Sequence, residues 1–387
     1  MSSLLRYRDR WGTDCLKWDD MERVFGDSDL LPMWVADMDF EAPECVKEAI
    51  VKYAADGLYG YYRVPDAYYD AFIAWEKNYH NYDVKREWIQ YVPGVVPALY
   101  WLVQVLTSVG DHVAVMPPVY PPFYSAVKDN NRKLAKCPLL NENGKYTMDL
   151  ERFEALVSDK QVKLFILCSP HNPAGRVWSE QELRAVLEIC RRYGVYVVAD
   201  EIHQDLIMSG HEQVSAAVVG DYGDMLVTLT SATKTFNIAG CQNAFLVIQD
   251  EAIRKRLEKI TKTIHAEEGN AFGYIAVQAA YEGGREWLDD LLQQVEINYR
   301  VLKTELAAHL PQAVISPLEG TYLAWVDMRA YLAPGEIKAV VQDSAGLAVN
   351  FGNLFGGGDY ASYIRINLAT RQESVEAAAK RLIDAIK

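Results

Sequence analysis

Apolar runs and helical patterns alternate along most of the chain. Continuous β-branched and apolar runs at residues 162–168 and 195–200 are typical of buried parallel strands. Apolar residues recur at helical spacing over residues 180–193 and 251–263, which predicts two amphipathic helices. Strands that alternate with helices from about residue 51 to residue 283 predict an α/β fold built on a doubly wound, mainly parallel sheet.

The pattern changes near residue 284, where a long amphipathic helix precedes further strands and helices. We therefore expect a second, smaller α/β domain over residues 285–387. The chain has 387 residues, of which half are hydrophobic, so it can bury a large core divided between two domains. It has no apolar span long enough to cross a bilayer, and its first ten residues lack the apolar core of a secretory signal.

Charge and cysteine usage narrow the class of protein. The formal net charge of −14 disfavours a nucleic-acid partner. The 6 cysteines show no Cys-x-x-Cys spacing, so we expect reduced thiols and a cytoplasmic location. The 7 histidines are scattered along the chain, and we expect no metal site.

Lys234 is the most informative candidate for chemistry. It lies in a segment of small hydroxyl residues, and an apolar stretch that ends at Gly240 follows it. A lysine amine can form an imine with an aldehyde, and nearby hydroxyls can bind a phosphate, so the segment suits pyridoxal phosphate, which carries both groups. A solvated surface lysine can have the same neighbours, so this interpretation needs complementary groups elsewhere.

Two such groups follow predicted strands. Asp200 ends the strand at 195–200, where a carboxylate can pair with a protonated pyridine nitrogen; the alternative is a helix N-cap. Asn172 lies at the tip of a turn after the strand at 162–168, where it can donate to a phenolate oxygen or bond its own backbone. The bonds before Pro170 and Pro173 in this turn are candidates for cis geometry.

Two further segments supply binding groups of other kinds. Gly94 precedes an apolar helix, and the backbone amides of Gly94, Val95 and Val96 can hold a phosphate there. Tyr120 is presented by a proline-rich loop, where it can stack on a cofactor ring or pack the loop onto the core.

Residues 363–369 alternate as a half-buried strand does, which places Arg365 and Asn367 on the same face. The planar fork of Arg365 fits a substrate carboxylate. The alternative is an exposed arginine on the solvated face of the strand.

In this order, the segments around Gly94, Asn172, Asp200, Lys234 and Arg365 resemble those of fold-type I pyridoxal-phosphate enzymes of the aminotransferase class I/II superfamily. The resemblance covers nearly the whole chain. It implies the PLP-dependent transferase fold type I and the role of Lys234 as the catalytic, imine-forming lysine.

The resemblance implies roles for the other groups as well. They are the pyridine-nitrogen partner Asp200, the ring-oxygen donor Asn172, the stacking Tyr120, the phosphate-binding Ser231 and the carboxylate anchor Arg365. It also implies a discontinuous small domain, in which residues 1–48 join residues 285–387 beside a large cofactor domain of residues 49–284.

The branch of the superfamily is indicated by residues 31–40, which are similar to the opening signature of carbon–sulfur β-lyases related to cystathionine β-lyase. We expect this segment to lie over the site, with Ala36 among the substrate-binding residues. His203 stands where many aminotransferases have a tyrosine that tunes the ring oxygen, and Gln242 where they often have a phosphate-binding arginine. Both departures fit the lyase branch.

Residues 59–61 resemble the stretch that reaches the neighbouring subunit's phosphate in this family, and Tyr61 is the better match. The resemblance thus implies a homodimer with shared active sites. The alternative is that Tyr59, Tyr61 and Tyr62 form an aromatic patch on the large domain.

The resemblance implies α,β-elimination of cystathionine or a cysteine-type amino acid to a thiol, pyruvate and ammonia, as in methionine biosynthesis. An amino-acid aminotransferase is one alternative, because transamination begins with the same loss of the Cα proton. A regulatory protein-binding role is another, because some relatives of this branch restrain a transcription regulator.

Overall fold

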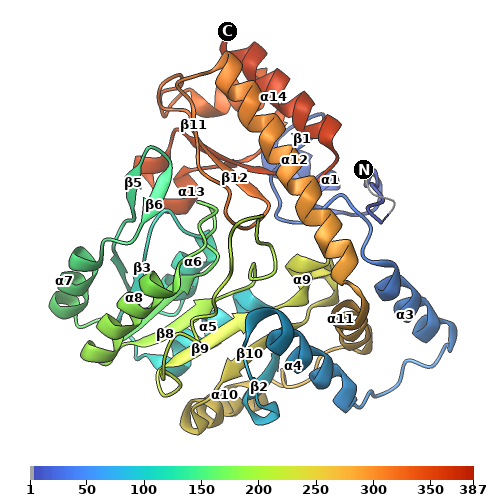
Figure 1. Ribbon diagram of the computed structural model, residues 1–387, viewed down its shortest axis with the longest axis vertical. Helices are drawn as coiled ribbons and strands as arrows, with labels where there is room; N and C mark the ends of the chain where they lie inside the picture. Colours follow the sequence, from blue (N-terminus) through green and yellow to red (C-terminus); the bar gives the residue numbers. More distant parts are fainter. Residues whose placement is uncertain (1–3) are drawn as a thin grey trace.

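The computed structural model describes residues 4–387, and its large central sheet has seven strands (Figure 1). In spatial order they are β2 (Ile89–Val92), β10 (Ala244–Ile248), β9 (Leu226–Thr230), β8 (Tyr196–Asp200), β7 (Leu164–Cys168), β3 (His112–Val115) and β4 (Lys133–Lys136). Neighbours from β9 to β4 are parallel, whereas β10 runs antiparallel to both β9 and β2. The prediction of a mainly parallel sheet is confirmed.

Helices cover both faces of this sheet, which explains the continuous apolar runs of its strands. Alternate residues of β7 face different layers: Phe165 packs in the cluster that holds α7 (Leu150–Lys160) and α8 (Glu180–Tyr193). Ile166 packs on the other face, in the cluster of α5 (Val95–Leu106), α6 (Pro121–Asp129) and α10 (Glu251–Thr263).

Local capping fixes the ends of the two helices that the sequence predicts. Ser179 and Glu182 form a capping box at the start of α8, and Gly194 ends that helix with φ 63°. Asp250 caps α10 by accepting from the backbone of Ile253. Both predicted helices are confirmed, and so are the cis bonds before Pro170 and Pro173; the bond before Pro118 is also cis.

The second sheet is smaller and entirely antiparallel. Its order is β11 (Val314–Ile315), β12 (Leu323–Asp327), β15 (Tyr363–Asn367) and β14 (Asn350–Phe351). The helices α12 (Arg285–His309) and α14 (Gln372–Ile386) run side by side over this part of the molecule (Figure 1).

The N-terminal segment packs against the C-terminal part of the chain. Here β1 (Leu31–Pro32) pairs in parallel with β13 (Leu347–Ala348). The segment also covers one face of β15, so every residue of β15 is buried and the expectation of a half-buried strand is wrong. The domain limits at residues 48 and 284 stay a prediction.

The other helical segments are α1 (Leu16–Asp19), α2 (Met21–Phe25), α3 (Glu44–Ala55), α4 (Asp66–His80), α9 (Ala232–Thr235), α11 (Ala271–Gly283), α13 (Asn353–Gly356), η1 (Arg86–Trp88), η2 (Ala239–Cys241), η3 (Ala339–Ser344) and η4 (Gly358–Tyr360). A hairpin of β5 (Leu140–Glu142) and β6 (Lys145–Thr147) completes the fold. Within residues 4–387, no helix is long and apolar enough to span a membrane.

Candidate active site

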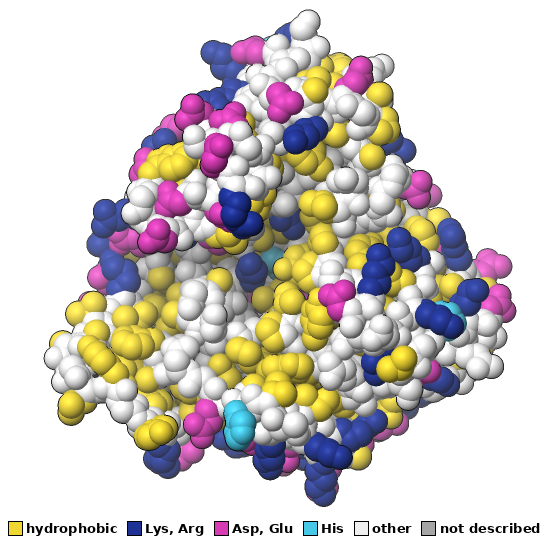
Figure 2. Space-filling model, turned by 180° about the vertical axis from the view of Figure 1, so that it is seen from behind, with side chains coloured by type: hydrophobic (Ala, Val, Ile, Leu, Met, Phe, Trp, Pro, Cys, Tyr) yellow, Lys and Arg dark blue, Asp and Glu magenta, His cyan; other side chains and the backbone are white. Residues whose placement is uncertain are grey.

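A cavity of about 220 Å³ lies at the carboxyl ends of β7 and β8 and at the start of α5. Figure 2 shows a hollow between the upper and lower parts of the molecule, with basic side chains inside it. The cavity is lined by Ala36, Pro93, Gly94, Val95, Val96, Pro97, Tyr120, Cys168, Asn172, Asp200, Ile202, His203, Thr233, Lys234, Ala239 and Gln242. The structure therefore brings most of the sequence-predicted site residues together.

Asp200 is the acidic group of this cavity. It is the last residue of β8, where it pairs in register with Cys168 and is almost completely buried. Burial raises the pKa of Asp200 to about 7, although the N–H of Ile202 and the charge of Lys234 lower it. The next element in the chain is β9, so the alternative of a helix N-cap is wrong. A cation beside Asp200 would favour its ionised form.

Lys234 faces Asp200 from the short helix α9. Ser231 caps α9 by accepting from the N–H of Thr233, and the amine of Lys234 donates to the backbone carbonyl of Ala36. Burial lowers the pKa of Lys234 to about 8, and the carboxylates of Asp37 and Asp200 oppose this effect. More of this amine is neutral near pH 8 than in an ordinary lysine, which suits a nucleophile or a base. The alternative of a surface lysine is wrong.

The phosphate-binding candidates lie at two helix starts. Gly94 is the N-cap of α5, and Val95 and Val96 begin the helix at the cavity wall. Helix N-termini carry N–H groups without helical partners and a partial positive charge, which suit an anion. Ser231 is buried, and its Oγ lies 2.6 Å from the carbonyl oxygen of Asn243, to which it donates.

Thr233 lines the cavity, whereas Ser231 is not among the lining residues. Thr233 is a cavity residue that was not expected from the sequence, although it lies two positions from Ser231 in the same segment. The two hydroxyl oxygens lie within hydrogen-bond distance of each other, at 2.8 Å, beside the start of α9, so sequence spacing alone did not show which of them faces the cavity.

Tyr120 and His203 line other parts of the cavity wall. Burial raises the pKa of Tyr120, and the nearby Asp200 adds to this effect. Burial lowers the pKa of His203 to about 3, with contributions from the charges of Lys234 and Arg365, so the imidazole is neutral. Its buried Nδ1 has no hydrogen-bond partner among the described residues, as expected for a group that binds a ligand.

Arg365 lies behind the lining residues. It is buried, so the alternative of a solvated arginine is wrong. Its guanidinium donates to Oδ1 of Asn172 at 3.0 Å, to the carbonyl of Trp34 at 3.1 Å and to Oδ1 of Asn350 at 2.5 Å. Its buried Nε has no partner among residues 4–387, and burial lowers its pKa to about 10. Arg365 is thus a cation fixed by neutral groups, ready to pair with an anion.

Tyr61 lies on the surface of the chain and is not among the residues that line this cavity. Its neighbours Tyr59 and Tyr62 both pack on Tyr53. The alternative of an aromatic patch therefore describes Tyr59 and Tyr62, while Tyr61 is fully exposed.

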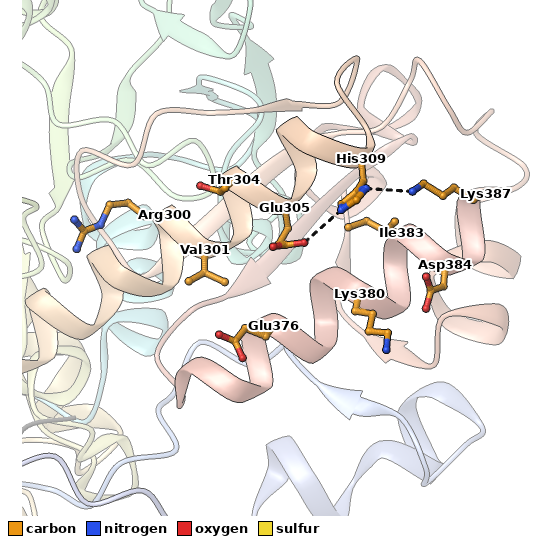
Figure 3. Close-up of a pocket in the computed structure, with 10 residues that line it drawn as sticks. All are labelled: Arg300, Val301, Thr304, Glu305, His309, Glu376, Lys380, Ile383, Asp384 and Lys387. Atoms are coloured by element: carbon orange, nitrogen blue, oxygen red, sulfur yellow. Dashed lines mark hydrogen bonds and ion pairs between the residues drawn. The ribbon is translucent and has the colours of Figure 1, made fainter.

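These groups fit pyridoxal phosphate. The cavity offers an amine for its aldehyde, a carboxylate for its ring nitrogen, helix N-termini for its phosphate and the unpartnered Nδ1 of His203. A larger hollow, of about 690 Å³, lies between α12 and α14 (Figure 3). There His309 contacts Glu305 and Lys387, and the side chains along the two helices carry charges of both signs. That hollow lacks the combination of groups that the cofactor needs.

Among the residues that the structure describes, no three His, Cys, Asp or Glu side chains gather in a way that could hold a metal ion.

The chain belongs to the aminotransferase class I and II family, whose model matches residues 28–382. It is 39% identical over 373 residues to the cystathionine beta-lyase PatB of Bacillus subtilis (strain 168), a match that covers 95% of this chain and 96% of that protein. The structure of cystalysin from Treponema denticola, which contains a pyridoxal 5'-phosphate cofactor, is similar with a TM-score of 0.95 and 32% identity, over 100% of this chain and 98% of that one. The PLP-bound C-S lyase from Staphylococcus hominis is similar with a TM-score of 0.92 and 32% identity, over 98% and 97% of the two chains.

Proposed function

We propose that this chain is a pyridoxal-phosphate-dependent carbon–sulfur β-lyase. The observation that carries the proposal is that Lys234 and Asp200 line one cavity, together with the first residues of α5. Relatives named as cystathionine beta-lyase and C-S lyase match over nearly the whole chain. The cofactor, when bound, withdraws electrons from the substrate and so acidifies its Cα–H bond.

The residues of the chain bind and orient the substrate. Arg365 pairs with the α-carboxylate, for which it exchanges one of its bonds to neutral oxygens. With the cofactor bound, Asp200 would keep the ring nitrogen protonated. Asn172 would donate to the ring oxygen from Nδ2, since Oδ1 of Asn172 accepts from Arg365. His203 is neutral and lines the same cavity, where its Nδ1, which has no partner among the described residues, is free to donate or accept.

Lys234 moves the proton. Its amine, with a pKa lowered to about 8, takes the proton from Cα when the substrate is held in place. Loss of this proton lets the thiolate leave from Cβ, and hydrolysis then gives pyruvate and ammonia. The substrate class is cystathionine and cysteine-type amino acids, in which sulfur is bonded to Cβ.

The reaction is tested with the purified protein, cystathionine and added pyridoxal phosphate. We expect equimolar free thiol and pyruvate, and we expect a Lys234→Ala variant to lose the visible absorbance of the bound cofactor and about 10³-fold in rate. A panel of β-thio amino acids then ranks the leaving groups. A requirement for an added 2-oxo acid, with no thiol released, would assign the aminotransferase activity instead.

The active unit is a homodimer in which each chain contributes Tyr61 to the phosphate site of the other. The full exposure of Tyr61 and its absence from its own chain's cavity support this arrangement. The protein acts in the cytoplasm, which is consistent with its six cysteines, all of which are free thiols. Sedimentation of the purified protein tests the dimer.

A further inference from the structure

The backbone carbonyl oxygen of Ala36 accepts hydrogen bonds from two side chains. One is the amine of Lys234, and the other is the hydroxyl of Tyr322, which donates across 2.9 Å. Tyr322 is completely buried and lies directly before β12. Because a carbonyl oxygen has two lone pairs, Tyr322 can hold this oxygen in place while Lys234 binds it.

The neighbouring carbonyls of the same segment are also bound by side chains. Arg365 donates to the carbonyl of Trp34 at 3.1 Å. The Nδ2 of Asn367 donates to the carbonyls of both Val35 and Asp37 at 2.6 Å. Residues 34–37 are therefore fixed against β15, and the carbonyl of Ala36 is a rigid acceptor rather than part of a mobile loop.

Only one of the two carboxylate oxygens of Asp37 accepts a hydrogen bond among the described residues. Its Oδ2 accepts from Arg10 at 2.8 Å, while its buried Oδ1 has no hydrogen-bond partner among the described residues. Burial lowers the pKa of Lys234, and Asp37 is the strongest of the charges that oppose this effect. The carboxylate of Asp37 thus raises the pKa of the Lys234 amine, which the carbonyl of the neighbouring residue Ala36 binds.

We propose that the carbonyl of Ala36 and the carboxylate of Asp37 form the resting site of the Lys234 ammonium ion during the elimination, with Tyr322 fixing the carbonyl. This inference rests on the proposed function. When the Cα–H bond breaks, the proton joins Nζ, and the electron pair forms the Cα–Cβ double bond as the thiolate leaves with the pair of the C–S bond. The amine becomes an ammonium ion in a buried place.

A buried ammonium ion needs an acceptor and a nearby negative charge. The carbonyl of Ala36 supplies the first and Asp37 the second. Neither Asp37 nor Tyr322 touches the reacting atoms, so both are positioning residues. Without them the protonated amine would have no fixed place beside the substrate.

Charged and titratable groups face Lys234 from every element packed around it. Asp37 comes from the N-terminal segment, Asp200 from β8 and Arg365 from β15, and His203 follows β8. The substitution Asp37→Asn removes one of the two carboxylates and leaves the arginine. The Lys234 ammonium ion should then lose its proton at a lower pH.

The first test uses the apoprotein and measures how fast acetic anhydride acetylates Lys234 across a range of pH, read by peptide mass spectrometry. We expect the midpoint of the curve of acetylation rate against pH to lie about one pH unit lower for Asp37→Asn than for the wild type. Glu41→Gln is the matched control, because Glu41 lies in the same N-terminal segment and pairs with Arg8 and Lys47. Its midpoint should equal that of the wild type. Equal midpoints for Asp37→Asn and the wild type would overturn the role of Asp37.

The second test uses the holoenzyme and Tyr322→Phe. We expect kcat to fall about tenfold with KM within twofold, and the kinetic isotope effect of Cα-deuterated substrate to rise. Tyr299→Phe is the control, because Tyr299 donates to the carbonyl of Ser316 across the same 2.9 Å, away from the cavity. An equal loss in both variants, or none in Tyr322→Phe, would overturn the role of Tyr322. A wild type without thiol release would refute the lyase activity, whereas the apoprotein labelling would still decide the place of the amine.

Discussion

Arg365 donates from Nη1 to Oδ1 of Asn172 across 3.0 Å, although the two residues are 193 positions apart in the sequence. The bond joins β15 to the turn that follows β7. Because the arginine uses the amide oxygen, the amide nitrogen of Asn172 is the group left to donate toward the cavity that Asn172 lines. Arg365 therefore orients Asn172, in addition to the pairing with a substrate carboxylate that we propose for it.

The substitution Arg365→Lys should impair substrate binding more than turnover. A lysine cannot reproduce a planar fork that donates to Asn172, Trp34 and Asn350 at once. Loss of a charged hydrogen bond costs about 1.5–3 kcal/mol, so we expect KM for cystathionine to rise about 10- to 100-fold. Steady-state thiol release measures it.

The control for this change is Arg329→Lys. Arg329 forms a forked pair with Asp327 at the surface, and its replacement should leave KM within twofold. If Arg365→Lys behaves like this control, Arg365 is not the carboxylate anchor.

Asp200 should make the stability of the apoprotein depend on pH. Burial raises the pKa of Asp200 from 3.8 to about 7, so the native state holds a proton that the unfolded chain releases. This stabilisation is complete below the unfolded pKa and is lost as the pH rises through about 7. The wild-type apoprotein should therefore lose about 2–3 kcal/mol of unfolding free energy from pH 5 to pH 8 that apo Asp200→Asn does not lose.

Urea unfolding of both apoproteins at pH 5 and pH 8 measures this difference. In the holoenzyme the effect of the substitution is reversed. A protonated ring nitrogen stabilises the ionised carboxylate of Asp200, and Asp200→Asn removes that carboxylate. We expect the same variant to bind pyridoxal phosphate more weakly than the wild type. A stability difference that stays constant with pH would mean that Asp200 is ionised in the apoprotein.

Local patterns in the sequence predicted the parts of the site that follow strands or begin helices. Asp200 and Asn172 each follow a continuous apolar run, and Gly94 stands before an apolar helix, so their places in the sheet could be expected. The cavity wall agrees with those expectations. The fold class was equally accessible, because strands and helices alternate at a regular spacing.

Long-range packing explains what the sequence left out. Tyr322 meets the carbonyl of Ala36 across 286 positions, and no periodic pattern encodes that contact. The burial of β15 depends in the same way on a distant segment that covers it, since Asn367 donates to the carbonyl of Val35. Alternation within the strand could not reveal this cover.

The substitution Glu319→Gln should destabilise the protein. Both carboxylate oxygens of Glu319 accept from the buried Arg176, at 2.8 and 2.7 Å, and one of them also accepts from the N–H of Val177. Removal of one charge of a buried pair costs about 3 kcal/mol, because the other charge stays buried. Urea unfolding measures the loss.

Glu154→Gln is the matched control. Glu154 pairs with Arg192 at the surface, and the loss of that pair should change the free energy of unfolding by at most about 1 kcal/mol. Equal effects of the two substitutions would show that Glu182, which also pairs with Arg176, is sufficient to hold the arginine.

Tyr61 should act in the cavity of the partner subunit. We expect Tyr61→Phe to weaken pyridoxal-phosphate binding about tenfold, whereas Tyr59→Phe, which loses only a bond to the carbonyl of Ala54, should not. Mixing the Tyr61→Phe and Lys234→Ala variants decides whether Tyr61 serves the site of the partner subunit or that of its own chain. Shared sites give hybrid dimers with one intact site, about one site in four overall, and tight binding returns after mixing. If Tyr61 served its own chain, no site in any dimer would contain both Tyr61 and Lys234, and mixing would restore nothing.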